Sequence, residues 1–487
     1  MPKPYMMTAA EVSESIRNQD ISAEEYLSSI LERIEKIDEK IHAFVTVVKD
    51  EALRRAREID EKARKGEKLS CLAGVAVAVK DNICTRGIRT TCSSRMLENF
   101  VPPYDATVIE KLKAADAVIL GKTNMDEFAM GTTTETSYFG ATHNPWDLRK
   151  VPGGSSGGSA AAVISEESSV ALGSDTGGSI RCPASYCSTV GLKPTYGLVS
   201  RYGLISYANS LEQIGPLART VCDCALLLSV ISGHDSRDST SVNLPSKDYL
   251  SSLIDDVKEL KIGLPREFFE EGVEEEVKGL VLKAADKFEE LGASCHEISL
   301  STMNYALAAY YIIAMSEASS NLARYDGLRY GYHDENNEGD FDTVFSRNRR
   351  IGFGAEVRRR IILGTYALSA GYFDQYYMKA LKIRTLIRRD FEKSFKHVDV
   401  IIGPTMPVLP FDIGERIDDP LKLYMCDILT VPANLTGCPA ISVPCGFVNG
   451  LPVGLQIIGR PFDEETILRV AYTFEQNTEY HKFRPPI

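Results

Sequence analysis

Two glycine-serine segments and one lysine carry the residue types that could do chemistry in this chain. The segments are Gly-Gly-Ser-Ser-Gly-Gly-Ser at 153–159 and Asp-Thr-Gly-Gly-Ser at 175–179, and Lys80 follows the apolar run 75–79. A serine hydroxyl is a weak nucleophile until a base takes its proton, and a lysine can be that base when burial lowers its pKa enough to leave the amine neutral. Glycines beside the serines let backbone N–H groups turn inward and donate to a developing oxyanion. The pattern predicts a serine hydrolase that works without a histidine.

Two other motifs in the same region predict different chemistry, but their surroundings argue against both. Residues 153–157 match G-x-S-x-G, the nucleophile elbow of α/β-hydrolases, yet that elbow directly follows a strand and residues 144–152 are typical of a loop. The later histidines that such a triad would need stand in ordinary contexts. Gly-Lys-Thr at 121–123 resembles the end of a phosphate-binding loop, but the first glycine of that motif would fall on Asp116. No ATP site is therefore expected in this chain.

The lysine run and the two glycine-serine segments together closely resemble the hallmark of the amidase signature family. The resemblance covers nearly the whole chain and includes Ile-Arg-Cys-Pro-Ala at 180–184 and Gly-Leu-Lys-Pro-Thr-Tyr-Gly at 191–197. It implies that Ser179 is the nucleophile and forms an acyl-enzyme. It also implies that Ser155, in a cis peptide, bridges the nucleophile to Lys80, the neutral base at the end of the relay.

The resemblance also implies roles for the residues around the nucleophile. The expected oxyanion donors are the backbone N–H groups of Thr176, Gly177, Gly178 and Ser179. Asp175 and Arg181 flank this loop and are expected to brace it rather than react. Ser156 and Ser159 are expected to make loop hydrogen bonds and a helix cap.

Five further stretches resemble the members of this family that release ammonia from glutamine for a tRNA-dependent amidotransferase. They are 128–131, 134–140, 144–147, 200–203 and 316–322. The resemblance implies a heterotrimer with B and C subunits, in which a partner uses the ammonia, ATP and Mg to convert Glu-tRNA(Gln) to Gln-tRNA(Gln). The chain itself would need no cofactor and no metal, and the partner would hold most of the tRNA.

Two alternatives remain beside this interpretation. A stand-alone amidase acting on another small amide would keep the same serines and lysine but would lack a paired arginine and acid in its pocket. A scaffold that merely docks a synthetic partner would not need an intact catalytic set, and the sequence departs from the family at none of Lys80, Ser155 and Ser179.

Free glutamine carries a carboxylate and an ammonium, so a selective pocket should offer an arginine to the first and an acid to the second. The resemblance implies Arg359 for the carboxylate, Asp427 for the ammonium and Tyr310 as a lining residue. Arg359 stands between two other arginines and Tyr310 beside Tyr311, so the register depends on the resemblance alone. Taken by themselves, these residues would indicate an exposed basic helix and an aromatic core patch.

Composition limits the classes of partner and compartment. The chain has 55 Lys and Arg against 67 Asp and Glu, and its net charge of −12 repels a phosphate backbone. Its 11 cysteines are odd in number and irregularly spaced, so we expect reduced, mostly buried thiols and no zinc site. The first residues lack the layout of a signal peptide, and no apolar run approaches the roughly 20 residues that span a membrane. We expect a cytoplasmic protein without a membrane segment.

The elements that would position the catalytic residues alternate between strands and helices, which predicts an α/β fold. We expect a single α/β/α layered domain over residues 1–487 with a mixed, mostly parallel central sheet. Within it, 1–65 would form an N-terminal helical segment, 66–230 the catalytic core, and 300–395 a helical insertion that shapes the substrate pocket. The expected strands are 75–79, 117–120, 170–172, 260–264, 294–298, 398–402, 440–443 and 453–458. Expected helices include 106–113, 159–164 and 274–291.

Overall fold

The computed structural model describes residues 3–245, 247–270, 272–335 and 338–487. These residues build one eleven-stranded sheet in the order β1-β3-β2-β4-β6-β5-β10-β11-β9-β7-β8. The strands are β1 (Phe44–Val47), β2 (Ala76–Lys80), β3 (Val118–Thr123), β4 (Val170–Asp175), β5 (Val190–Lys193), β6 (Gln213–Ala218), β7 (Lys261–Pro265), β8 (Ser294–Ile298), β9 (Val400–Pro404), β10 (Ala440–Val448) and β11 (Leu451–Ile458). The expected α/β fold and mixed sheet are confirmed.

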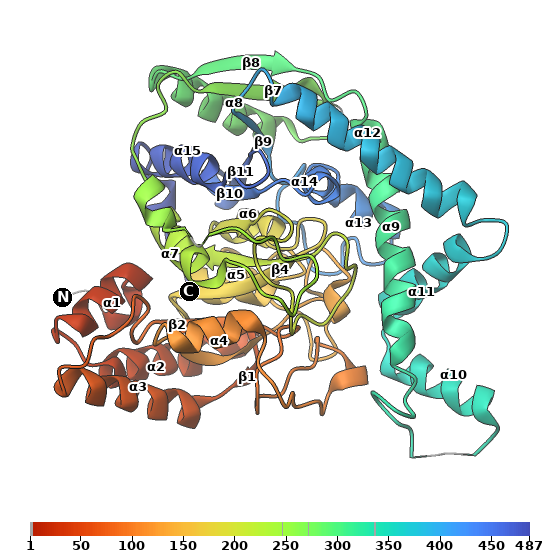
Figure 1. Ribbon diagram of the computed structural model, residues 1–487, viewed down its shortest axis with the longest axis horizontal. Helices are drawn as coiled ribbons and strands as arrows, with labels where there is room; N and C mark the ends of the chain where they lie inside the picture. The colour runs from red at the N-terminus through yellow and green to blue at the C-terminus, as the bar shows by residue number, and fades with distance from the viewer. Residues whose placement is uncertain (1–2, 246, 271, 336–337) are drawn as a thin grey trace.

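Helices surround this sheet and extend beyond it on one side (Figure 1). They are α1 (Ala9–Arg17), α2 (Ala23–Ile41), α3 (Lys49–Arg64), α4 (Thr107–Ala114), α5 (Gly157–Ile164), α6 (Arg181–Cys187), α7 (Val221–Ile231), α8 (Glu275–Glu290), α9 (Ala306–Asn321), α10 (Phe341–Gly352), α11 (Ala355–Leu368), α12 (Lys379–Ser394), α13 (Pro420–Tyr424), α14 (Val431–Thr436) and α15 (Glu464–Gln476). The expected strands and helices of the catalytic core are all present, with ends shifted by a few residues.

The direction of the strands differs from the expectation of a mostly parallel sheet. Among the described strands, four pairs are parallel and six are antiparallel. One antiparallel pair, β10 with β11, is a hairpin closed by Asn449 and Gly450, both with positive φ. That conformation suits the tight turns that join antiparallel strands, and Asn-Gly is their usual sequence. Strands joined by a helix remain parallel, as β2 and β3 are across α4.

The central strands are buried on both faces, as their continuous apolar runs predict. In β2, Ala78 packs in a cluster with α5 and α6, whereas Val77 and Val79 pack in a larger cluster with α4 and α7. Alternate side chains of one strand therefore serve opposite layers. Lys80 ends this strand with no solvent exposure.

The N-terminal helices begin where the sequence places its capping residues. Thr8 and Glu11 form a reciprocal capping box at the start of α1. Ser22 caps α2 by accepting the N–H of Glu25, and the carboxylate of Asp60 accepts the two preceding N–H groups.

Residues 306–395 are largely helical, as expected for the insertion. In Figure 1, α9 lies between the sheet and α11, and the connection from α11 to α12 forms the right-hand edge of the molecule. Helix packing is close here, because a Cβ on Gly364 of α11 would lie 1.9 Å from the carbonyl oxygen of Met315 in α9.

All 11 cysteines are free thiols in the structure and eight are buried, so the expectation of mostly buried cysteines is confirmed. Across the described residues, no helix combines the length and the apolar character needed to cross a membrane.

Candidate functional site

The topology of the sheet brings Lys80 to the same edge as residues 175–179, called here the nucleophile loop because it contains the expected nucleophile Ser179. Strands β2 and β4 are parallel neighbours, so their carboxyl ends lie side by side. Lys80 is the last residue of β2, and β4 runs directly into the segment 175–179. Ser155 stands two residues before α5, which packs on both strands.

Lys80 and Ser155 form the innermost contact of the site. Lys80 Nζ lies 2.7 Å from Ser155 Oγ and 3.2 Å from the carbonyl oxygen of Ser174. Neither Lys80 nor Ser155 is exposed to solvent. Burial lowers the pKa of Lys80 to about 7, although the carboxylates of Asp126 and Asp175 oppose the shift. A large fraction of this amine is therefore neutral near pH 7 and able to accept a proton.

The two serine segments are joined through their backbones. The N–H of Ser156 donates to the carbonyl oxygen of Ser179 at 3.1 Å. The peptide between Gly154 and Ser155 is cis, as the resemblance implies. Ser179 keeps 8% of its surface exposed while Ser155 keeps none, so the expected nucleophile is the serine nearer to solvent.

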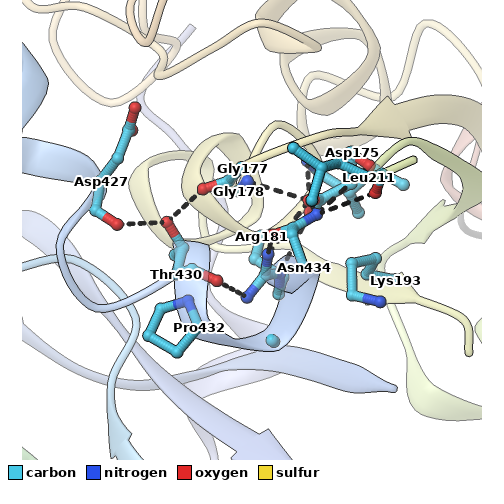
Figure 2. A network of polar contacts seen from close by, with 12 residues as sticks. Asp175, Gly177, Gly178, Arg181, Lys193, Leu211, Asp427, Thr430, Pro432 and Asn434 are labelled. Atoms are coloured by element: carbon cyan, nitrogen blue, oxygen red, sulfur yellow. Dashed lines mark hydrogen bonds and ion pairs between the residues drawn. The ribbon is translucent and has the colours of Figure 1, made fainter. Parts of the chain in front are cut away.

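A buried ion pair braces the nucleophile loop, as expected for Asp175 and Arg181 (Figure 2). Arg181 donates Nε to Asp175 Oδ2 and Nη2 to Asp175 Oδ1, both at 3.0 Å. Burial alone would raise the pKa of Asp175, but this guanidinium holds it well below its usual range. Arg181 also donates to the carbonyl oxygen of Thr430 at 2.9 Å and to Asn434 Oδ1 at 2.6 Å. The pair therefore connects the nucleophile loop to the C-terminal part of the chain.

One of the expected oxyanion donors has another acceptor. The N–H of Gly178 donates to Asp175 Oδ1 at 2.9 Å. This buried carboxylate also accepts hydrogen bonds from the N–H of Ile180 and from Arg181. The expectation that four backbone N–H groups are free to donate to the oxyanion is therefore wrong for Gly178 in this structure. The loop carbonyl of Gly177 is in turn fixed by the hydroxyl of Thr430, at 2.6 Å (Figure 2).

Gly177 and Gly178 have no room for side chains. A Cβ on Gly177 would lie 2.4 Å from the hydroxyl oxygen of Tyr310, and one on Gly178 would lie 2.4 Å from Thr430 Oγ1. Gly178 also has a φ of +137°, which L side chains rarely adopt. Tyr310 thus packs against the nucleophile loop itself.

The structure corrects the helix-cap part of the expectation for Ser156 and Ser159. Ser156 is the N-cap residue of α5 but makes no side-chain cap, since its hydroxyl donates to the carbonyl oxygen of Ser174 at 3.2 Å. Ser159 lies inside α5, where its hydroxyl contacts Thr123 Oγ1 at 2.7 Å. The hydroxyls hold α5 to the ends of β3 and β4 instead of capping it.

Asp427 lies buried beside the nucleophile loop, with 8% of its surface exposed. Tyr311 donates its hydroxyl to Asp427 Oδ2 at 2.6 Å, and Thr132 donates to Asp427 Oδ1 at 3.2 Å. Burial raises the pKa of Asp427 to about 7, and these two hydrogen bonds oppose the rise. Of the two adjacent tyrosines, Tyr311 contacts the acid and Tyr310 contacts the glycine loop, with their rings 4.9 Å apart.

The three consecutive arginines of α11 occupy different environments. Arg358 is exposed, Arg359 is half-exposed and ion-paired with Glu356, and Arg360 is buried. Arg360 donates Nε to Glu356 Oε1 at 2.7 Å, and the hydroxyl of Tyr424 donates to the same oxygen at 2.6 Å. Glu356 therefore holds the guanidinium groups of both Arg359 and Arg360.

Several residues of this site had no signal of their own in the sequence. Tyr424 ends α13, Thr430 directly precedes α14, and Asn434 lies within α14. All three are far along the chain from the serine segments. Only their closeness to Asp427 in the sequence links them to the site. Glu356 could have been found from its position one helical turn before Arg359 and Arg360.

Other features of the structure bear on what the site can hold. A cavity of about 1190 Å³ is lined by residues from 84–104, 204–206 and 321–335, and none of Lys80, Ser155 and Ser179 lines it. This hollow therefore lies between the core and the insertion rather than over the serines. Within the described part of the chain, no three His, Cys, Asp or Glu side chains gather as a metal ion would require.

Comparison with known proteins agrees with this geometry. The family model described as amidase matches residues 25–468. The chain is 59% identical over 483 residues to the A subunit of glutamyl-tRNA(Gln) amidotransferase from Carboxydothermus hydrogenoformans, covering 99% of each protein. It is 57% identical to the protein of the same name from Moorella thermoacetica, again covering 99% of each.

Solved structures extend the comparison to the fold. The crystal structure of the A subunit of glutamyl-tRNA(Gln) amidotransferase from Thermotoga maritima superposes with a TM-score of 0.81 at 43% identity, covering 100% of this chain and 98% of that one. A bacterial aryl acylamidase of the amidase signature enzymes superposes with a TM-score of 0.86 at 28% identity, covering 98% of each chain. With the family model matched across its core and these relatives matched along its length, the chain belongs to the amidase signature family.

Proposed function

We propose that this chain is the glutamine-hydrolysing A subunit of a glutamyl-tRNA(Gln) amidotransferase. The observation that carries the chemistry is the 2.7 Å contact between Lys80 Nζ and Ser155 Oγ, in a setting that lowers the pKa of Lys80 to about 7. A buried lysine that is partly neutral can serve as a general base. The choice of glutamine, and not another amide, is supported by the relatives that carry this name over 99% of the chain.

In the first half of the reaction, Ser179 attacks the carbon of the glutamine side-chain amide. Its hydroxyl proton passes to Ser155 Oγ while the Ser155 proton passes to the neutral Lys80. The protonated Lys80 then returns a proton through Ser155 to the amide nitrogen, and the C–N bond breaks to release ammonia. In the second half, a water molecule attacks the acyl-enzyme by the same relay, which frees glutamate and restores Ser179.

The oxyanion of each tetrahedral intermediate would be held by the backbone N–H groups of Thr176, Gly177 and Ser179. The N–H of Gly178 donates to Asp175 instead and would hold the loop in shape. Removing one oxyanion donor typically costs about 3 kcal/mol of transition-state stabilisation. The braced loop thus sets where the charge of the transition state can develop.

Glutamine would be recognised through both of its charged groups. Asp427, beside the nucleophile loop, would accept the ammonium, and Tyr311 and Thr132 fix its carboxylate oxygens. Arg359 would leave Glu356 to bind the α-carboxylate as a planar fork. Tyr310 would line the pocket where it contacts Gly177. An amide without these two charges would gain neither interaction.

The proposed complex contains B and C subunits with this chain as a heterotrimer in the cytoplasm. The synthetic partner would hold Glu-tRNA(Gln) together with ATP and Mg and would receive the ammonia. The net charge of −12 on this chain repels the phosphate backbone, which is consistent with the partner binding most of the tRNA.

The test is ammonia release by the purified chain, alone and with its B and C subunits, from glutamine and from a panel of simple amides. Glutamine-selective release that the partner subunits strengthen supports the proposal. Preference for amides without a carboxylate and an ammonium, with no effect of the subunits, would overturn it in favour of a stand-alone amidase.

A further inference from the structure

Large apolar side chains gather on the outward face of α11 and on the turn that follows it. This set, called here the α11 stripe, is 38–68% exposed and consists of Ile362, Leu363, Tyr366, Tyr372, Phe373 and Tyr376. The opposite face of α11, with Val357, Arg360 and Gly364, is buried, and α11 packs closely on α9. The stripe therefore lies on the side of α11 away from its buried face. Helix α11 itself is at the right of Figure 1.

The α11 stripe is continuous rather than a scatter of single residues. Ile362 and Tyr366 are four residues apart on the helix and so are neighbours on its surface. The ring of Tyr366 lies 4.5 Å from that of Tyr372 and 5.9 Å from that of Tyr376. A contiguous apolar surface that remains exposed marks an interaction site more often than an accident of sequence.

The charge around the stripe is opposite to that of the chain. Residues 356–382, which contain the stripe and its flanks, hold five Lys and Arg and two Asp and Glu, although the whole chain has a net charge of −12. Arg358 and Lys379 are exposed at the two ends of the stripe, and Asp374 is an exposed acid within it. The apolar surface thus has a basic border on an otherwise acidic protein.

These properties select among possible occupants. Four of the six side chains are aromatic, but the rings of Tyr366, Tyr372 and Tyr376 already pack on one another. Ile362 and Leu363, at the start of the stripe, offer neither a hydrogen bond nor a ring on which a nucleotide base could stack. A symmetric contact with a second copy of this chain would place one basic border against another. A protein surface with an apolar centre and carboxylates around it would pack on the apolar stripe and pair with the basic residues at its border.

We propose that the α11 stripe docks a partner protein subunit that presents an apolar surface bordered by carboxylates. The inference rests on the proposed function, under which this partner is the subunit that consumes the ammonia. Leu363 stands one helical turn after Arg359, the expected ligand of the glutamine carboxylate. A partner seated on Leu363 would therefore reach the half-exposed Arg359 guanidinium and affect glutamine binding as well as assembly.

The test compares Leu363→Asp with Leu282→Asp in the complex formed with the B and C subunits. Leu363 is 44% exposed on α11, and Leu282 is 46% exposed on α8, so the two variants place the same charge on equally exposed leucines. Affinity is measured by sedimentation or titration of this chain with the purified partner subunits, and the glutamine KM is measured in the assembled complex. We expect Leu363→Asp to weaken assembly at least tenfold and to raise the KM, and Leu282→Asp to change affinity less than twofold. Because the border is basic, affinity for the partner should also fall as the salt concentration rises.

Several outcomes would overturn the proposal. Unchanged affinity in Leu363→Asp, or an equal loss in Leu282→Asp, would show that the stripe is not the docking surface. Normal assembly with weakened tRNA binding would assign the stripe to nucleic acid, and a loss of self-association in the isolated chain would assign it to a second copy. Assembly is measured without substrate, so a complex that depends on the stripe but releases no ammonia from glutamine would refute the proposed function and leave the docking surface standing.

Discussion

Asp175 and Arg181 are joined by two hydrogen bonds of 3.0 Å, and neither side chain is exposed to solvent. Asp175 ends β4 and Arg181 begins α6, so the pair closes the loop that contains Ser179. Arg181 also donates to the carbonyl oxygen of Thr430, three residues after Asp427. The same guanidinium thus positions the expected nucleophile relative to the expected ligand of the glutamine ammonium.

Replacing Arg181 by Met should destabilise the protein strongly. The substitution leaves the Asp175 carboxylate buried without its partner, and breaking a buried ion pair in this way typically costs about 3–5 kcal/mol. We expect urea unfolding to show a loss of this size in the free energy of unfolding. Arg388→Met breaks the exposed pair of Arg388 with Glu392 and should cost less than about 1 kcal/mol. Equal stability of the two variants would contradict the bracing role.

The pH dependence of kcat should follow the protonation state of the Lys80 amine. Burial lowers the pKa of this lysine to about 7, so at lower pH the amine is protonated and cannot accept the proton from Ser155. In steady-state assays of the assembled complex with saturating glutamine, kcat should rise nearly tenfold per pH unit below about pH 7 and level off above it. A flat profile between roughly pH 5.5 and 7 would show that Lys80 is not the base.

The pH dependence of the glutamine KM should follow the ionisation of the Asp427 carboxyl. Burial raises the pKa of this carboxyl to about 7, and only its ionised form can pair with the glutamine ammonium. The KM should therefore fall as pH rises through about 7. In Asp427→Asn the KM should be high and should lose this pH dependence, while the rise of kcat due to Lys80 remains. A KM that stays pH-dependent in Asp427→Asn would assign the titration to another group.

The sequence was sufficient for the part of the site that depends on local pattern. An apolar run ending in Lys80 predicts a buried strand and a lowered lysine pKa, and the structure shows both. Glycines beside Ser179 predict backbone conformations that other residues rarely adopt, and Gly178 has a φ of +137°.

What the sequence could not decide depends on packing between distant segments. Consecutive residues of a helix point about 100° apart, so only the packing of α11 on α9 leaves Arg359 half-exposed while Arg360 is buried. The same holds for Tyr310 and Tyr311 on α9. Nothing local to Gly178 indicates that its amide is taken by Asp175, because that depends on how the loop folds around the carboxylate.

Ser179→Ala should abolish glutamine hydrolysis and leave the fold intact. The substitution removes the hydroxyl that we propose forms the acyl-enzyme, and loss of a nucleophile of this kind lowers kcat by at least about a thousandfold. Ammonia release from glutamine and the thermal unfolding midpoint are the two measurements. If the B and C subunits are present, free ammonium should still support amidation of Glu-tRNA(Gln), because this chain supplies only the ammonia. Near-normal glutamine hydrolysis would refute the role of Ser179.

Arg359→Ala should mainly raise the glutamine KM, because it removes the proposed ligand of the substrate carboxylate and leaves the serines and Lys80 untouched. A hydrogen bond to a charged group contributes about 1.5–3 kcal/mol, which corresponds to a rise of roughly 10- to 100-fold in KM. Arg358→Ala is the matched control, since Arg358 is the adjacent arginine and is exposed. Steady-state kinetics over a range of glutamine concentrations separates the two variants. If Arg359→Ala kept the wild-type KM while Arg358→Ala raised it, the carboxylate ligand would be the residue one position earlier on α11.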